Sequence, residues 1–275
     1  MAGAARVAAA QPLPDAGVTE AVDVGVDAGV DEAPSEEDER AAARVMPDER
    51  EPPDPIAEEA ERSGPFEGPA PAEHPALATE IAALSDRACY RALTRARVSF
   101  DRVRSLVAGV MTPVVVRGPL RGVVFRENRH RVVEELMDCR LAVALTRYAS
   151  LLRAQGVREV HHISLYRAAT PREIARQPVQ TRHPGGMAID VSSYIFDSGQ
   201  ELVVERDYHG RRRRPPCGPT ARVPTQPQAR ALRTLGCEAA RRGYFHVILG
   251  PNYNYEHRNH YHLEVARHVA WQFVR

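Results

Sequence analysis

Residues 181–190 read TRHPGGMAID and residues 257–262 read HRNHYH, and the side chains suited to chemistry are concentrated in these two segments. The first segment runs from a turn into an apolar stretch that predicts a strand. His183 therefore lies in the turn and Asp190 within the strand. The paired glycines between them allow the backbone to turn tightly, so we expect the two side chains to converge.

The second segment places two histidines on one side of a predicted strand. His260 and His262 are two residues apart, and side chains with this spacing in a strand project from the same face. His and Asp are ligands of catalytic zinc ions, which use three protein ligands and one water molecule. One histidine can therefore bind a metal while the other faces its water. The alternatives are His257 as a ligand, His260 as a fourth ligand of a structural site, or a surface pair without metal. Glu264 alternates onto the face of His262.

The surrounding hydrophobic pattern predicts helices and short strands without a regular alternation. The strongest helix is predicted over 131–154, where large apolar residues recur on one face and Gly156 supplies the stop signal. This pattern favours a single α+β domain with a small, mainly antiparallel sheet flanked by helices. The other predicted helices cover 78–97 and 226–242, and the predicted strands cover 113–116, 122–126, 157–166, 187–195, 202–205, 246–249 and 260–266.

The first 75 residues differ in composition from the rest of the chain. They contain 19 of the 36 acidic residues, 5 of the 37 basic ones and 11 of the 22 prolines. Such a segment cannot bury enough apolar surface to offset its ordering entropy. We therefore predict a disordered acidic Pro/Ala-rich tail over 1–75 and a folded domain over 76–275. Residues 8–12, AAAQP, are compatible either with the end of a truncated signal peptide or with a plain Ala-rich tail.

The chain has four cysteines, Cys89, Cys139, Cys217 and Cys237, and no C-x-x-C pair. An even number without metal-site spacing is compatible with two disulfides in any of three pairings, or with four buried thiols. The pairing of Cys217 with Cys237 would clamp an Arg- and Pro-rich loop to the helix that follows. We predict this disulfide together with Cys89–Cys139. Both would place the protein outside the cytosol, in the periplasm or in the extracellular space.

The sequence argues against two partner classes, the membrane interior and nucleic acids. No stretch approaches the roughly 18 consecutive apolar residues of a membrane span. The four arginines at 211–214 lie in a Pro-rich loop without interleaved aromatic residues, so we interpret them as a solvated loop and expect no nucleic-acid partner.

His161 and His162 are adjacent, so only one can face the core, and we expect a structural role for them. We expect the protein to be a monomer.

Several motifs, taken in order, resemble a known family. The pattern T-x-H-x-x-G-x-A-x-D at 181–190, followed by H-x-H at 260–262, resembles the zinc motifs of the D-alanyl-D-alanine peptidase and murein endopeptidase superfamily, which has the hedgehog/DD-peptidase fold. More closely, about residues 80–267 are similar to the extensin-like C-terminal domain family of bacteria. The further motifs that support this similarity are DCRLA at 138–142, LYR at 165–167 and LGPNYN at 249–254.

This resemblance implies an activity and a role for each matched residue. It implies that His183, Asp190 and His262 bind Zn²⁺, that His260 handles protons or stabilises charge, and that Arg167 lies close to a substrate carboxylate or the developing oxyanion. The expected function is a zinc-dependent hydrolase that cleaves an amide bond in peptidoglycan peptides. The alternative is a non-catalytic, zinc-containing module of the same fold that binds peptidoglycan or another cell-wall polymer.

Two positions depart from the pattern of the resembled superfamily. Thr181 replaces the usual serine, which is a mild change. Asn259 stands three residues before His262, where the carboxypeptidase branch has an acidic general base. Because an amide cannot take a proton, we expect the arrangement of the endopeptidase branch, with His260 in the catalytic role.

Overall fold

A computed structural model describes residues 75–128, 135–172, 181–222 and 224–275 of the chain. The tail predicted over 1–75 therefore lies, up to residue 74, outside the described residues. The described residues belong to one unit, Glu51–Arg275. Within them, no helix combines the length and apolar character that a membrane span requires.

The first described helices correct one prediction. The helix predicted over 78–97 is two helices, α3 (Ala76–Ala82) and α4 (Asp86–Arg95). Ser85 separates them because its hydroxyl accepts a hydrogen bond from the backbone N–H of Ala88, 3.4 Å away, and so caps the start of α4.

The central helix begins later than its periodicity suggested. α5 covers Cys139–Ala154, and the residues before it form strand β4 (Glu135–Asp138). The predicted helix over 131–154 is therefore wrong for 135–138, while its first residues, 131–134, lie outside the described residues. The Asp138 carboxylate accepts a hydrogen bond of 2.9 Å from the N–H of Arg140, which caps the helix at this point.

β4 belongs to a small antiparallel sheet in the order β1-β2-β4. Its middle strand is β2 (Pro113–Arg117), close to the predicted strand. β1 (Ser99–Arg102) was not predicted, because three of its four residues are exposed and it shows no apolar alternation. β1 is held in place by its antiparallel pairing with β2.

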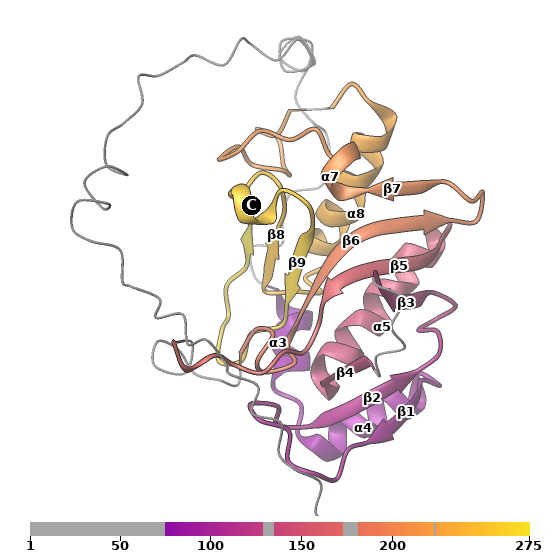
Figure 1. Cartoon of the computed structure of the whole chain (residues 1–275), viewed down its shortest axis with the longest axis vertical. Helices are drawn as coiled ribbons and strands as arrows, with labels where there is room; N and C mark the ends of the chain where they lie inside the picture. The colour runs from indigo at the N-terminus through magenta and orange to yellow at the C-terminus, as the bar shows by residue number, and fades with distance from the viewer. Residues whose placement is uncertain (1–74, 129–134, 173–180, 223) are drawn as a thin grey trace, which may run out of the picture. The chain divides into compact units, whose positions relative to one another are not determined.

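The larger sheet runs in the order β10-β8-β9-β6-β5-β3, with β7 paired to β6 (Figure 1). Its pairs are antiparallel except β3 with β5 and β10 with β8. The α+β class with mainly antiparallel pairing is confirmed, and the strands form two sheets. The strands are β3 (Val124–Glu127), β5 (Val157–Ser164), β6 (Ala188–Phe196), β7 (Glu201–Val203), β8 (Val247–Leu249), β9 (Tyr261–Glu264) and β10 (Phe273–Val274).

Three helical segments complete the described chain. α8 (Pro227–Arg241) agrees with its prediction and begins with a proline in its first turn, where the missing N–H costs nothing. The strand predicted over 202–205 is shorter, because α7 (Val204–Asp207) starts directly after β7. The short 3-10 helix η1 (Tyr255–His257) precedes β9.

Helix α5 forms the centre of the core. It packs against strands of both sheets and against α3, α4 and α8 (Figure 1). Tyr148 of α5 is fully buried, its ring meets that of Phe245 edge to face at 5.6 Å, and its hydroxyl lies 3.0 Å from that of Tyr194 in β6. The sheets therefore share one core built on this helix.

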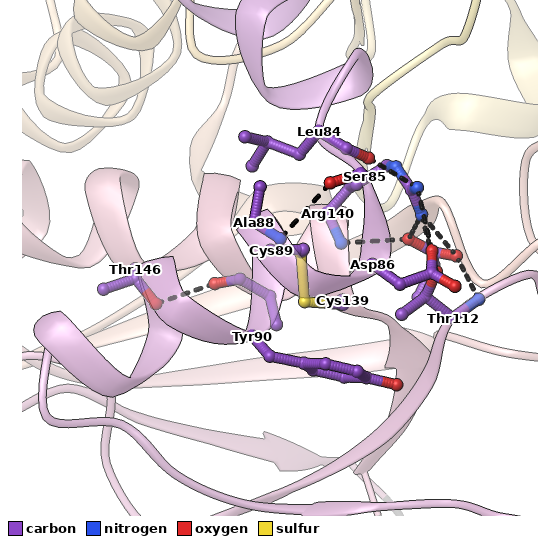
Figure 2. Close-up of a disulfide and its surroundings, with 12 residues drawn as sticks. Leu84, Ser85, Asp86, Ala88, Cys89, Tyr90, Thr112, Cys139, Arg140 and Thr146 are labelled. Atoms are coloured by element: carbon purple, nitrogen blue, oxygen red, sulfur yellow. Dashed lines mark hydrogen bonds and ion pairs between the residues drawn. A yellow bond between two sulfur atoms is a disulfide. The ribbon is translucent and has the colours of Figure 1, made fainter.

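A buried arginine joins the start of α5 to its neighbours (Figure 2). Arg140 is 2% exposed. Its Nη1 donates to Asp138 at 3.0 Å and to the hydroxyl of Thr112 at 2.9 Å, and its Nη2 donates to the Leu84 carbonyl at 2.6 Å. Because a buried guanidinium requires such partners, this cluster fixes the loop before α4 against β4 and α5.

Both predicted disulfides are present. Cys89–Cys139 links α4 to the first residue of α5, with Cα atoms 6.1 Å apart (Figure 2). Cys217–Cys237 holds the Arg-rich loop to α8, with Cα atoms 5.5 Å apart. Disulfides persist in oxidising compartments, so the pair fits a protein that folds outside the cytosol.

A buried histidine connects the first and last described segments. His246 has no exposed surface; its Nδ1 accepts the N–H of Ala266 at 3.0 Å, and its Nε2 lies 3.3 Å from the hydroxyl of Thr79 in α3. Burial lowers the pKa of this imidazole below its ordinary value. It therefore serves as a neutral acceptor, and a proton on Nδ1 would remove the hydrogen bond to Ala266.

We predict that this histidine makes the fold acid-sensitive. In the unfolded chain it takes up a proton near its ordinary pKa of 6.5, whereas in the folded chain it does so only at lower pH. The unfolded state then binds more protons below about pH 6.5, so the free energy of unfolding falls by at most about 1.4 kcal/mol per pH unit. Denaturant unfolding of His246→Gln should show a smaller decline over this range. His268→Gln, at an exposed position, is the control, and equal slopes for both variants would contradict the prediction.

Candidate metal centre

The candidate site is built on two neighbouring antiparallel strands. Asp190 of β6 is in direct register with His262 of β9 on one side and with Ser164 of β5 on the other. The carboxylate therefore projects from a central strand and is buried, with 9% of the residue exposed. The prediction that 187–195 forms a strand carrying Asp190 is confirmed.

A tight turn brings His183 back to this carboxylate. The turn is closed by a hydrogen bond of 3.0 Å from the N–H of Gly186 to the His183 carbonyl, and Gly186 has a positive φ of 63°. The Gly186 carbonyl in turn accepts the N–H of Asp138 at 2.9 Å. As a result His183 Nε2 lies 3.0 Å from Asp190 Oδ2, and the expected convergence is confirmed.

Three predicted ligand residues meet at one point. His262 Nδ1 lies 2.9 Å from Asp190 Oδ1, and the rings of His183 and His262 meet edge to face with centroids 5.1 Å apart. One ligand atom from each of the three residues lies within 4.8 Å of the others. Two imidazoles and one carboxylate are a donor set that divalent transition metals bind, and together they fit such an ion.

The outer nitrogen of each histidine also has a partner. His183 Nδ1 donates to the Leu165 carbonyl at 2.7 Å, and this contact orients the ring so that its Nε2 faces Asp190. His262 Nε2 lies 3.3 Å from Glu264 Oε2. Such outer contacts orient histidine ligands in metal sites. Glu264 was expected on this face from strand alternation, whereas a backbone partner such as Leu165 has no signal in the sequence.

The electrostatics of the cluster favour a cation. Burial alone raises the pKa of Asp190, but hydrogen bonds to His183 and His262 outweigh it and hold that pKa well below its usual range. Burial alone lowers the pKa of His262, yet its hydrogen bonds to Asp190 and Glu264 raise it to about 9. A proton on His262 thus balances two buried carboxylates, and a metal ion that binds here must displace it.

Two further histidines lie at the edge of the cluster. His260, 8% exposed, places Nε2 3.5 Å from Asp190 Oδ1 and Nδ1 2.8 Å from Asn259 Oδ1. β9 begins only at Tyr261, so His260 lies just before the strand on which it was expected, and its ring nevertheless approaches Asp190. The ring of His257, the alternative ligand, is tilted against that of His260 with centroids 5.0 Å apart, and its Nδ1 donates to Asn254 Oδ1 at 2.6 Å. Among the described residues it is not part of the three-residue group.

Arg167 lies close to the cluster through its backbone. Its N–H donates to the His183 carbonyl at 3.4 Å, and its side chain is exposed. The structure therefore brings the segment 165–167 against His183, while the contact of Arg167 with a substrate remains a prediction.

Comparison with known proteins gives one match. Residues 87–275 match the family model described as "Extensin-like protein C-terminus". This match covers all five predicted site residues and both disulfides. A search of the curated proteins and a search of the solved structures found no match.

We predict that Gly186 cannot carry a side chain. A Cβ at this position would lie 2.7 Å from the backbone nitrogen of Asp138, in addition to the strain of a positive φ. Gly199, in the turn after β6, has a φ of 85° but open space around it. Gly186→Ala should therefore lower the free energy of unfolding by about 1–3 kcal/mol more than Gly199→Ala, as measured by denaturant titration. Equal losses would show that the close approach to Asp138 is unimportant.

Proposed function

The chain belongs to the extensin-like protein C-terminus family, and we propose that it is a zinc-dependent hydrolase that cleaves an amide bond in peptidoglycan peptides. The observation that carries this proposal is the convergence of His183, Asp190 and His262 beside His260. The substrate class comes from the likeness of the same motifs to those of the zinc peptidases that act on the cell wall.

The three-residue group has the composition of a catalytic zinc site. His183 would bind through Nε2, His262 through Nδ1 and Asp190 through its carboxylate, since these atoms face one another. Three protein ligands leave a coordination position open for water or substrate. Bound zinc polarises carbonyl groups and lowers the pKa of water to about 7.

His260 is suited to accept a proton beside this group. Because its Nδ1 donates to Asn259 Oδ1 at 2.8 Å, its Nε2 carries the free lone pair. Burial lowers the pKa of the imidazole, which keeps it neutral near pH 7. In this proposal His260 takes a proton from the attacking water and returns it to the leaving amine. Asn259, which cannot act as a base itself, then orients the residue that does.

Arg167 would bind the substrate. Its main chain is tied to His183, and its exposed guanidinium offers paired donors that match the geometry of a carboxylate. It would hold the carboxylate of a peptide, or the charge that develops on the scissile carbonyl. The two disulfides support a location in the periplasm or outside the cell, where such peptides occur.

One observation favours a second function. Asn259 stands three residues before the last ligand, where the carboxypeptidase branch of the resembled superfamily has an acidic residue. If His260 does not replace that acid, the domain would be a zinc-containing module that binds a cell-wall polymer without cleaving it. Turnover by a His260 variant separates the two functions.

We predict that the three ligands are each required for zinc. His183→Ala, Asp190→Ala and His262→Ala should each lower the affinity for Zn²⁺ by at least about 100-fold, and Glu264→Gln by about 10–100-fold through its contact with His262. Zinc content and titration with a competing chelator measure this. His257→Ala is the matched control and should keep its zinc. Retention of full affinity by His262→Ala would overturn the ligand assignment.

We predict that His260→Ala keeps zinc and the fold but loses about 10²–10⁴-fold in the rate of muropeptide hydrolysis, the range of a lost general base. The release of new amines measures turnover, and zinc content is measured on the same sample. Loss of zinc would support a closed structural site with four ligands. Undiminished turnover would remove His260 from the mechanism, and no hydrolysis by the unaltered protein would favour the binding module.

A further inference from the structure

A pocket lies next to the candidate metal centre. It has a volume of about 570 Å³, and the end of strand β5 forms part of its lining. Two of its lining residues also contact the metal centre, since Ser164 Oγ and the Leu165 carbonyl lie 3.2 and 2.7 Å from His183 Nδ1. Its described lining residues are Glu127, Glu135, Leu136, His162 and residues 163–167.

Two polar atoms of this pocket, Glu127 Oε2 and His162 Nδ1, are buried hydrogen-bond acceptors that no donor in the described part of the chain reaches. His162 is 3% exposed and donates its Nε2–H to the Glu135 carboxylate, whose oxygens lie 2.9 and 3.0 Å away. The other nitrogen, Nδ1, is then an acceptor, and it too is buried without a partner. The expected structural role of His162 explains the hydrogen bond of its Nε2 to Glu135, but it does not explain why Nδ1 is buried without a donor from the described residues.

These unpaired acceptors indicate what the pocket binds. A buried carboxylate oxygen without a donor is destabilising, and a ligand that supplies the donor recovers that free energy. An ammonium group has a positive charge, three N–H donors and no acceptor. A metal ion fits less well, because among the described residues the metal-like spacing occurs only at His183, Asp190 and His262.

The remaining walls define the rest of the ligand. Leu136, Ile163 and Leu165 provide aliphatic surface beside the carboxylates, and Ile163 is 39% exposed. An aliphatic chain that ends in an ammonium group can bury its methylene groups against these residues while its charge reaches the acidic side chains.

We propose that this pocket binds the primary ammonium group of an aliphatic side chain. Resting on the proposed function, we assign it to a diamino acid in the peptide substrate, whose backbone would pass along residues 164–167 toward His183. Glu127 and Glu135 would bind the ammonium group, and Arg167, which also lines the pocket, would bind a carboxylate of the same peptide. The pocket would then select peptides with a free side-chain amine.

Binding of a lysine derivative tests this proposal without any requirement for hydrolysis. Nα-acetyl-lysine N-methylamide is titrated into the full chain by calorimetry, beside the same compound with its side-chain amine acetylated. We expect the charged compound to bind at least about tenfold more tightly, the factor of one charge-assisted hydrogen bond. Equal affinities, or no binding of either compound, would overturn the proposal.

A variant separates a binding role of Glu127 from a structural one. Glu127→Gln should weaken binding of the charged compound by about tenfold or more, while its melting temperature stays the same or rises, because a carboxylate with one buried, unpaired oxygen is replaced by a neutral amide. Glu80→Gln, at an exposed position of α3, should change neither quantity. Unchanged binding in Glu127→Gln would overturn the proposal, as would a fall in melting temperature with the selectivity for the charged compound retained.

The two proposals fail in different ways. If the unaltered protein binds the charged compound selectively but hydrolyses no muropeptide, the pocket stands and the hydrolase proposal is wrong. If it hydrolyses muropeptides with free and with acetylated side-chain amines equally well, the hydrolase stands and the pocket assignment is wrong.

Discussion

The hydrogen bond from the backbone of Asp138 to the Gly186 carbonyl is the contact on which the site depends. The carboxylate of the same aspartate caps α5, pairs with buried Arg140 and accepts the N–H of Thr112 at 2.9 Å. One residue therefore links the central helix, the small sheet and the turn that carries His183. Because the turn approaches this backbone too closely for a side chain, only glycine permits the contact. The position of the first ligand is thus set by the packing of α5, and the Cys89–Cys139 disulfide fastens the same helix end to α4.

Buried charge shapes the centre of the large sheet. Asp190 and Glu264 are both buried, and His262 between them carries a proton that compensates part of their charge. An arrangement of this kind costs free energy in a low-dielectric interior unless each charge is paired. The burial that makes this arrangement of charges costly also makes it a good cation site, since the acceptor atoms are already oriented and desolvated. The outer contacts of both histidines leave one nitrogen of each directed at the carboxylate of Asp190.

The end of β5 connects this centre to the neighbouring pocket. Its last residues contact His183, while His162 on the same strand pairs with Glu135 of β4. β5 also pairs with β3, which ends at Glu127. Two sheets therefore supply the acidic side chains of the pocket, and strand β5 joins them to the metal centre.

The sequence by itself determined the features that depend on neighbouring residues. Strand periodicity placed His260 and His262 on one face, two adjacent glycines predicted the turn at His183, and the apolar repeat located most of α5. Pairings between distant segments depended on the tertiary structure. Residues 135–138 have no local signal for a strand and become one only because β2 lies alongside, while exposed β1 shows no alternation at all. Four cysteines allowed three pairings, and proximity in the fold selects one. The pocket is lined by side chains from three strands. These strands are far apart in the sequence, so no spacing along the chain could predict that their side chains lie together. Burial and hydrogen bonding between them arise only when the chain packs.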